Sequence, residues 1–268
     1  MPEGHTLHRL ARRHQKLFGG RPVAVSSPQG RFAPEASVVD GRVLKRAEAY
    51  GKHLFHVYAP DAIVHVHLGL IGVFNEQPRP EAPPRGAVRM RMVGETHVAD
   101  LNGPNRCRLV NAAERSALLA ELGPDPLRRD ADPDRAWQRL SRSRQSVAQL
   151  LMDQRVLAGV GNVYRAEVLF RHNLDPMTPG RELDRALWLA MWTDLVALMR
   201  TGVRRGRIDT VRDEHLPRTM GRAPRQDRHG GEVYVYRRTG QPCLVCGTPV
   251  ATAELAGRNL YWCPTCQA

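Results

Sequence analysis

Hydrophobic residues after Gly4 recur at every third or fourth position and stop at Gly19-Gly20, which predicts an amphipathic helix at the beginning of the chain. Alternation of apolar and polar residues, typical of half-buried strands, follows in six segments: 22–25, 41–49, 52–58, 63–68, 88–92 and 96–100. Four prolines between 78 and 84 predict an exposed loop. This part of the chain therefore predicts an all-β block, a sandwich or a barrel, with a helix laid on its first edge.

A second block has helical periodicity and follows a break at residues 123–133, where proline, glycine and aspartate cluster. Apolar residues between 183 and 198 predict a long amphipathic helix that packs into a core. The stretch 204–228 is rich in arginine and poor in apolar residues, so it predicts a mobile linker or one that follows DNA.

The turn Gly159-Val160-Gly161 lies between two helical segments of this block. Backbone N–H groups of such a turn, next to a helix N-terminus, can bind phosphate. Asn162 would cap the helix and could also donate to a phosphate. A plain turn between two helices is the alternative.

Four cysteines near the end of the chain give the most specific pattern. Cys243-x2-Cys246 and Cys263-x2-Cys266 are separated by sixteen residues, which fits a zinc-binding template. Four thiolates leave no open coordination position, so we expect one structural Zn²⁺ ion in a short hairpin module. Cys107 has no partner in this pattern and is expected to be a packed thiol.

The net charge of +13 and the pI near 10.4 favour a polyanionic partner, nucleic acid first, over a basic surface that binds nothing. Only three of the 40 basic residues are lysines: Lys16, Lys45 and Lys52. No apolar run of 18 residues occurs and no signal peptide precedes Pro2, so we expect a cytoplasmic protein without a membrane partner.

The first residues, Met1-Pro2-Glu3-Gly4, carry candidate chemistry. Removal of Met1 would leave Pro2 with a free secondary amine, and an α-amino group titrates near ~8. Condensed with an aldehyde, this amine becomes a cationic iminium that accepts electrons. The simpler interpretation is a helix start, with Pro2 as its first residue and Glu3 facing the positive end of the helix dipole.

Two further features can be interpreted in two ways. Leu70 and Ile71, in the loop Gly69-Leu70-Ile71-Gly72, could form a core turn or a wedge that enters a base stack. His65 and His67 share one strand face, but no third ligand supports a metal site there.

Taken together and in order, several motifs resemble the formamidopyrimidine-DNA glycosylase and endonuclease VIII family of base-excision repair enzymes. They are Pro2-Glu3-Gly4, Gly51-Lys52, His67-Leu68-Gly69-Leu70-Ile71-Gly72, Gly159-Val160-Gly161-Asn162, and Arg258 followed by Tyr261-Trp262-Cys263-Pro264-Thr265-Cys266-Gln267. The resemblance covers essentially the whole chain.

The resemblance implies a multidomain α+β fold that binds damaged double-stranded DNA as a monomer. It implies an N-terminal β-sandwich with a helix at residues 1–124, a helix-two-turn-helix domain at 125–222 and a four-cysteine zinc finger hairpin at 229–268. The implied activity is that of a bifunctional DNA glycosylase and AP lyase, which cleaves the strand by β- or β,δ-elimination.

Residue by residue, the resemblance makes Pro2 the Schiff-base nucleophile and Glu3 the proton donor. Lys52 would contact phosphate and assist β-elimination, while Arg258 would bind phosphate and assist δ-elimination. The remaining matches concern DNA binding: Asn162 to phosphate, Arg106 facing the unpaired base, and Leu70 and Ile71 filling the space left by the flipped base.

Some positions depart from the family pattern. Thr6 stands where the family often has a glutamate, and Gly69 stands where endonuclease VIII enzymes place a glutamine. The loop 67–72 is closer to the purine-repair branch, whereas the two ends of the chain resemble endonuclease VIII, so oxidised pyrimidines are the favoured substrates. The alternatives are a non-catalytic zinc-finger DNA-binding protein and an AP lyase without glycosylase activity.

Overall fold

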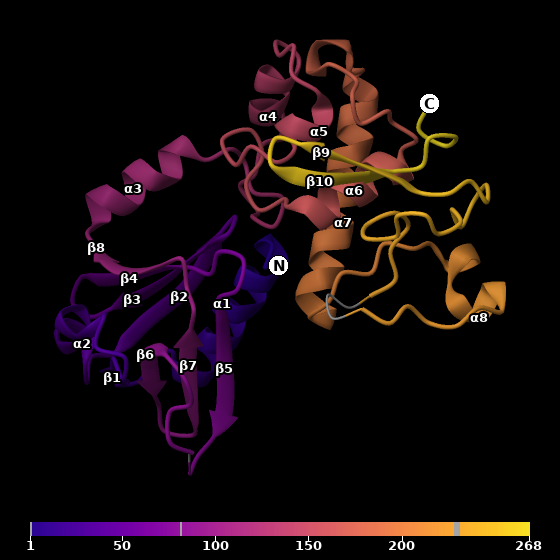
Figure 1. Ribbon diagram of the computed structural model, residues 1–268. Helices are drawn as coiled ribbons and strands as arrows, with labels where there is room; N and C mark the ends of the chain where they lie inside the picture. Colours follow the sequence, from indigo (N-terminus) through magenta and orange to yellow (C-terminus); the bar gives the residue numbers. More distant parts are fainter. Residues whose placement is uncertain (1, 81, 228–230) are drawn as a thin grey trace. The chain divides into compact units, whose positions relative to one another are not determined.

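The structure is a computed structural model that describes residues 2–80, 82–227 and 231–268. The chain divides into two compact units, Met1–Glu121 and Leu122–Ala268 (Figure 1). Met1, whose removal the sequence predicts, lies outside the described residues.

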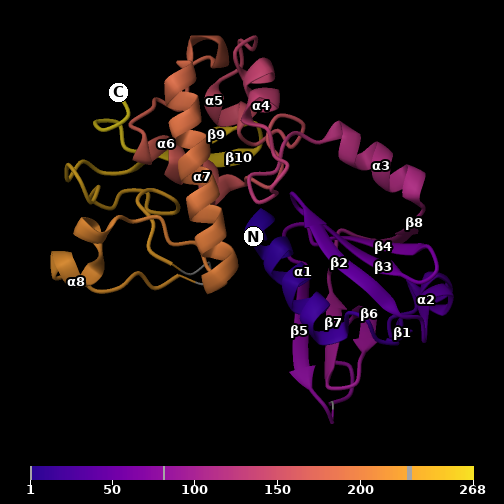
Figure 2. The same ribbon diagram turned by 180° about the vertical axis from the view of Figure 1, so that it is seen from behind.

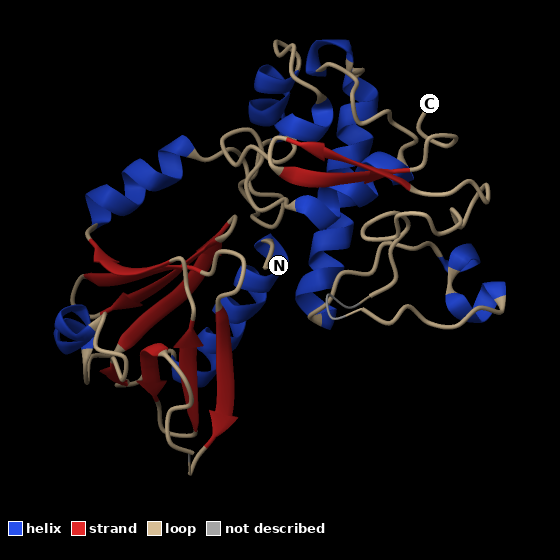
Figure 3. Cartoon of the chain, viewed as in Figure 1, coloured by secondary structure: helices blue, strands red, loops and turns tan. Residues whose placement is uncertain are grey.

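The first unit contains two four-stranded antiparallel sheets, with strand orders β1-β6-β7-β5 and β2-β3-β4-β8 (Figure 3). Buried apolar side chains from both sheets and from the first helix form one core, which makes this unit the expected sandwich and not a barrel. Its elements are α1 (Gly4–Phe18), β1 (Ala24–Ser26), α2 (Ala33–Val39), β2 (Leu44–Tyr50), β3 (His53–Tyr58), β4 (Ala62–His67), β5 (Val73–Pro78), β6 (Val88–Val93), β7 (His97–Asn102), β8 (Arg106–Val110) and α3 (Ala112–Glu121).

A buried polar network joins α1 to the strands of this unit. Nδ1 of His14 lies 2.9 Å from Nε2 of His56 on β3, and Nε2 of His14 lies 3.2 Å from Oε1 of Glu76 on β5. Both imidazoles are fully buried. The network therefore fixes the helix that begins beside Pro2 and Glu3.

Burial has a consequence for stability in acid. It lowers the pKa of His56 to about 4 and that of His53 and His65 to about 3, and it holds the pKa of His14 well below its usual range. In the unfolded chain the same imidazoles bind protons near pH ~6.5. The unfolded state therefore binds more protons below that pH, and the free energy of unfolding falls as the solution is acidified.

We expect the first unit to lose stability between pH 6.5 and 5, by up to about 1.4 kcal/mol per pH unit for each excluded proton. Urea unfolding at a series of pH values measures this slope. The double variant H14L/H56L removes two of the imidazoles, so its slope should be flatter than that of the unaltered protein. Equal slopes for the two proteins would show that His14 and His56 do not cause the loss of stability in acid.

The second unit combines helices with the C-terminal hairpin. Its helices are α4 (Pro133–Leu140), α5 (Val147–Leu150), α6 (Asn162–Arg171), η1 (Gly180–Glu182), α7 (Arg185–Arg205), η2 (Asp213–His215) and α8 (Pro217–Met220), and its strands are β9 (Ala251–Leu255) and β10 (Arg258–Trp262). The long helix α7 runs beside α6 (Figure 2). One core contains apolar residues of the helices and of the hairpin together, so the finger is packed into this unit.

Glu167 on α6 is the main polar link between the helices and the segment that leads to the hairpin. Its buried carboxylate accepts hydrogen bonds from the backbone N–H groups of residues 234, 235 and 236, at 2.7, 2.9 and 2.9 Å. Three N–H donors satisfy the buried carboxylate and hold this segment against α6. Across the described ranges, no helix is long and apolar enough to cross a membrane.

Candidate functional site

Pro2 and Glu3 stand immediately ahead of α1. Glu3 is the N-cap residue in an extended conformation, and its backbone carbonyl accepts a hydrogen bond from Thr6 N at 2.9 Å. Its side chain makes no capping hydrogen bond and is fully buried, whereas Pro2 is half-buried. The helix begins at Gly4, so the simpler interpretation, in which Pro2 is its first residue, was wrong. The acid is withdrawn from water instead of capping the helix. Such an environment suits a carboxyl group that must donate a proton.

Strand register places basic residues in a row at one end of the sheet β2-β3-β4-β8. Lys52 occupies the turn before β3, His53 begins β3 and pairs with His67 at the end of β4, and His67 pairs with Arg106 at the start of β8. Burial, followed by the charges of Lys52 and Arg106, lowers the pKa of His67. The two histidines are therefore neutral at pH 7, and it is the charges of Lys52 and Arg106 that can act together on an anion such as a phosphate.

The loop between β4 and β5 presents Leu70 and Ile71 to solvent, with 55% and 82% of their surfaces exposed. This exposure excludes a core turn. Gly69 has φ +69°, and a Cβ atom there would lie 2.8 Å from Cβ of Asn105. A side chain at position 69 would displace the segment that leads to Arg106, which explains why this chain has glycine where a glutamine was expected.

The helix α6 begins differently from the prediction. Gly161, not Asn162, is its N-cap residue, and Asn162 is its first helical residue, 5% exposed. The N–H group of Gly159 donates to Oε1 of Gln154 at 2.9 Å, so it is not available to a phosphate. The prediction that Asn162 caps the helix was wrong because its side chain is engaged with the hairpin: Nδ2 donates to the carbonyl of Asn259 at 3.0 Å.

Arg258 opens β10 and is exposed, directly after a turn in which Ala256 and Gly257 have φ values of 50° and 71°. The neighbouring Asn259 carbonyl binds Asn162 and also accepts a hydrogen bond from Nη2 of Arg165 at 2.9 Å. The second unit thus brings Asn162 and the strand start that carries Arg258 together. The first unit contains the other candidate residues, which are Pro2, Glu3, Lys52, Leu70, Ile71 and Arg106.

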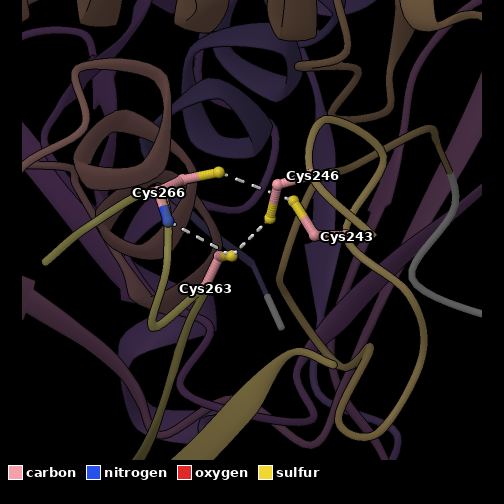
Figure 4. Close-up of side chains that lie close together, drawn as sticks. All are labelled: Cys243, Cys246, Cys263 and Cys266. Atoms are coloured by element: carbon pink, nitrogen blue, oxygen red, sulfur yellow. Dashed lines mark hydrogen bonds between the residues drawn. The ribbon is translucent and has the colours of Figure 1, made fainter. Parts of the chain in front are cut away.

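The four predicted zinc ligands converge (Figure 4). All four Sγ atoms lie within 4.8 Å of one another, with Cys243 to Cys266 at 3.9 Å and Cys246 to Cys263 at 3.4 Å. Sulfur atoms about 3.8 Å apart are what a tetrahedral ion with Zn–S bonds of about 2.3 Å requires. This donor set fits one structural zinc ion, and no other group of three or more potential ligands occurs within the described ranges.

A cavity of about 580 Å³ in the second unit lies in the arginine-rich stretch that the sequence suggested was a linker. That stretch contains η2 and α8. Three cavity arginines are already paired with carboxylates: Arg207 with Asp209, Arg222 with Glu232 and Arg225 with Asp227. Their positive charge is thus largely neutralised within the unit.

Two residues of the site were not predicted from the sequence: Arg165, which lies beside Asn162, and His53, which pairs with His67 in the row of basic residues. Helical spacing places residues 162 and 165 on one face, but it gives no indication that a guanidinium is buried there.

Comparisons with known proteins cover the whole chain. Residues 1–108 match the formamidopyrimidine-DNA glycosylase N-terminal domain, residues 122–213 its H2TH domain, and residues 240–268 the zinc finger found in FPG and IleRS. The chain is 56% identical to endonuclease 8 1 of Mycobacterium tuberculosis, with full coverage of both proteins. The chain belongs to the formamidopyrimidine-DNA glycosylase and endonuclease VIII family.

Within this family, the chain lies on the endonuclease VIII branch, as the sequence predicted. It is 32% identical to a probable endonuclease 8 2 of Streptomyces coelicolor, covering all of this chain and 94% of that protein. It is 30% identical to a formamidopyrimidine-DNA glycosylase of Thermus thermophilus, covering all of this chain and 98% of that protein.

Solved structures confirm the expected α+β fold of the family. A MutM protein, solved with DNA that contains carbocyclic 8-oxo-G, has a TM-score of 0.80 at 20% identity, with 99% of both chains covered. The Lactococcus lactis Fpg, solved with DNA containing an abasic site, has a TM-score of 0.80 at 18% identity and the same coverage. This family member is a DNA glycosylase with AP lyase activity in base-excision repair.

Proposed function

We propose that this enzyme removes oxidised bases, pyrimidines before purines, from double-stranded DNA through a Schiff base at the nitrogen of Pro2. The observation that carries the proposal is the Pro2-Glu3 pair ahead of α1, in a chain that matches an endonuclease 8 over its full length. A secondary amine displaces the base at the sugar carbon C1′. Cleavage of the C1′–O4′ bond, with a proton delivered to O4′, then gives an iminium that draws electrons from the sugar.

Each remaining site residue has a role in this proposal. Buried Glu3 donates the proton that base loss and ring opening need. Lys52 binds a backbone phosphate and assists β-elimination. Arg106 faces the unpaired base. Arg258 binds phosphate and assists δ-elimination.

The exposed side chains of Leu70 and Ile71 fill the space that the flipped nucleotide leaves in the duplex. Asn162 donates its amide hydrogen to a phosphate. The net charge of +13 supports binding to the DNA backbone.

The protein is placed in the cytoplasm as part of the same proposal, since its named relatives are bacterial and bacterial chromosomes lie there. The binding partner is damaged duplex DNA, and one chain suffices for the reaction.

Single-turnover kinetics test the substrate preference. Two duplexes of the same sequence carry either 5-hydroxycytosine or 8-oxoguanine, and an undamaged duplex serves as the control. We expect base excision from the oxidised pyrimidine to be at least about fivefold faster, because the termini of this chain match the endonuclease VIII branch. Faster excision of the oxidised purine would contradict the preference and would leave the glycosylase activity intact.

A further inference from the structure

Arg165 on α6 is a buried guanidinium, 1% exposed, one helical turn after Asn162. Its Nη2 atom donates to Oδ1 of Asn162 and, at 2.9 Å, to the carbonyl oxygen of Asn259. The same carbonyl accepts a hydrogen bond from Nδ2 of Asn162 at 3.0 Å. Arg165, Asn162 and the backbone of β10 thus form a closed set of three hydrogen bonds.

This set determines which way the amide of Asn162 points. A guanidinium has only donors, so the Asn162 atom beside it must be the oxygen, and the nitrogen must face the Asn259 carbonyl. One of the two hydrogens on Nδ2 is used by that carbonyl. The other has no partner among the described residues and remains for a DNA phosphate.

The set also fixes the start of β10. Asn259 follows Arg258 directly, so its carbonyl is held within one residue of the arginine that binds phosphate in the proposed function. Apolar contacts alone would hold β10 against α6, as the buried Leu260 does nearby. Burying a guanidinium is costly, and here Nη2 is satisfied by the Asn162 amide and the Asn259 carbonyl, a use that packing alone would not require.

We propose that Arg165 is a positioning residue that orients the Asn162 amide and holds the start of β10, so that Asn162 and Arg258 bind the DNA backbone as one unit. The inference rests on the proposed function, in which these two residues contact phosphates. Arg165 itself is buried and acts through Asn162 and Asn259.

The test is the affinity for a duplex that carries a tetrahydrofuran abasic-site analogue, measured by fluorescence anisotropy with N162A, R165M and the double variant. We expect N162A and R165M each to weaken binding about 5- to 20-fold. The double variant should bind within about twofold of N162A, because residues that act through one another are not additive. R165K keeps the charge but loses the planar fork, and it should bind as weakly as R165M.

R171M is the matched control. Arg171 lies on the same helix and is also tied down by hydrogen bonds, but its partners are Asp194 on α7, at 2.6 and 2.8 Å, and the carbonyl of Thr210. R171M should lower the melting temperature and leave DNA affinity within about twofold. An equal loss of affinity in R171M and R165M would overturn the inference, because the effect would then be one of stability.

Three other outcomes are decisive. Binding by R165M and R165K at the unaltered level, or losses that multiply in the double variant, would overturn the role of Arg165 and leave the proposed function standing. Unchanged binding by N162A would instead remove Asn162 from the proposed function. R165K decides the question by the same criteria if R165M loses zinc or fails to fold.

Discussion

Replacing Glu3 by Gln is expected to abolish base excision, slowing it by a factor on the order of 10²–10⁴, which is the usual contribution of a general acid or base. Glutamine has nearly the volume of glutamate, so it fits the fully buried position at the start of α1, but it has no acidic proton to donate. Cleavage at a preformed abasic site does not need the base-loss step. It should therefore persist, within roughly a factor of ten of the unaltered rate.

Single-turnover assays on a lesion-bearing duplex and on an abasic duplex measure the two steps separately. E121Q is a matched control, because Glu121 is exposed at the end of α3 in the same unit. It should alter neither rate. Base excision by E3Q at the unaltered rate would show that another group supplies the proton.

Removing zinc is the second change with a large expected effect. The four sulfur atoms approach one another within 4.8 Å, and without a metal nothing offsets the repulsion of closely spaced thiolates. The hairpin should then lose its order, and Arg258 with it. We expect affinity for a duplex with an abasic-site analogue to fall at least about 10-fold. The helices α6 and α7 should remain helical, because the helices supply more residues of the shared apolar core than the hairpin does.

A chelator titration measures both effects, the loss of DNA affinity by fluorescence anisotropy and the retained helicity by circular dichroism. Added Zn²⁺ should restore binding. C263A and C107A form a matched pair. Cys263 is a zinc ligand, whereas Cys107 is a buried thiol on β8 whose pKa burial raises to about 12. C107A should retain one zinc ion per chain and full affinity. Tight binding by metal-free protein would contradict the structural role of the finger.

The elements predicted from the sequence are those whose side chains reveal which face is buried. Alternation marks the strands around Leu54 and Val64 because one side of each strand enters the core of the sandwich. The strands β5 and β8, which both lie at sheet edges, were missed. After Phe74, β5 continues as Asn-Glu-Gln-Pro, which an edge tolerates, and β8 begins with Arg106-Cys107-Arg108.

The predictable part of the site is the part encoded by spacing. Cysteine spacing indicates the zinc ligands, and motif order indicates Pro2, Glu3 and Arg258. Contacts between distant residues leave no such pattern. The bond from Asn162 to the carbonyl of Asn259 spans 97 positions, and this bond is why the asparagine does not cap its own helix.

The packing of the zinc finger also depends on contacts between distant residues, so the sequence did not predict it. The sequence predicts a short hairpin module around a zinc ion, and in the structure Leu260 and Tyr261 of this module pack with the helices of the second unit. Hydrophobic residues in a short hairpin do not indicate which surface covers them, so only the structure reveals this shared core.

The central claim is that the nitrogen of Pro2 joins covalently to deoxyribose. Borohydride reduction of the enzyme with a lesion-bearing duplex, followed by protease digestion and mass spectrometry of the cross-linked peptide, tests it most directly. The expected adduct lies on a peptide that begins at Pro2, with Met1 removed. A protein that retains Met1 and forms no reducible adduct, or an adduct located on Lys52, would contradict the claim.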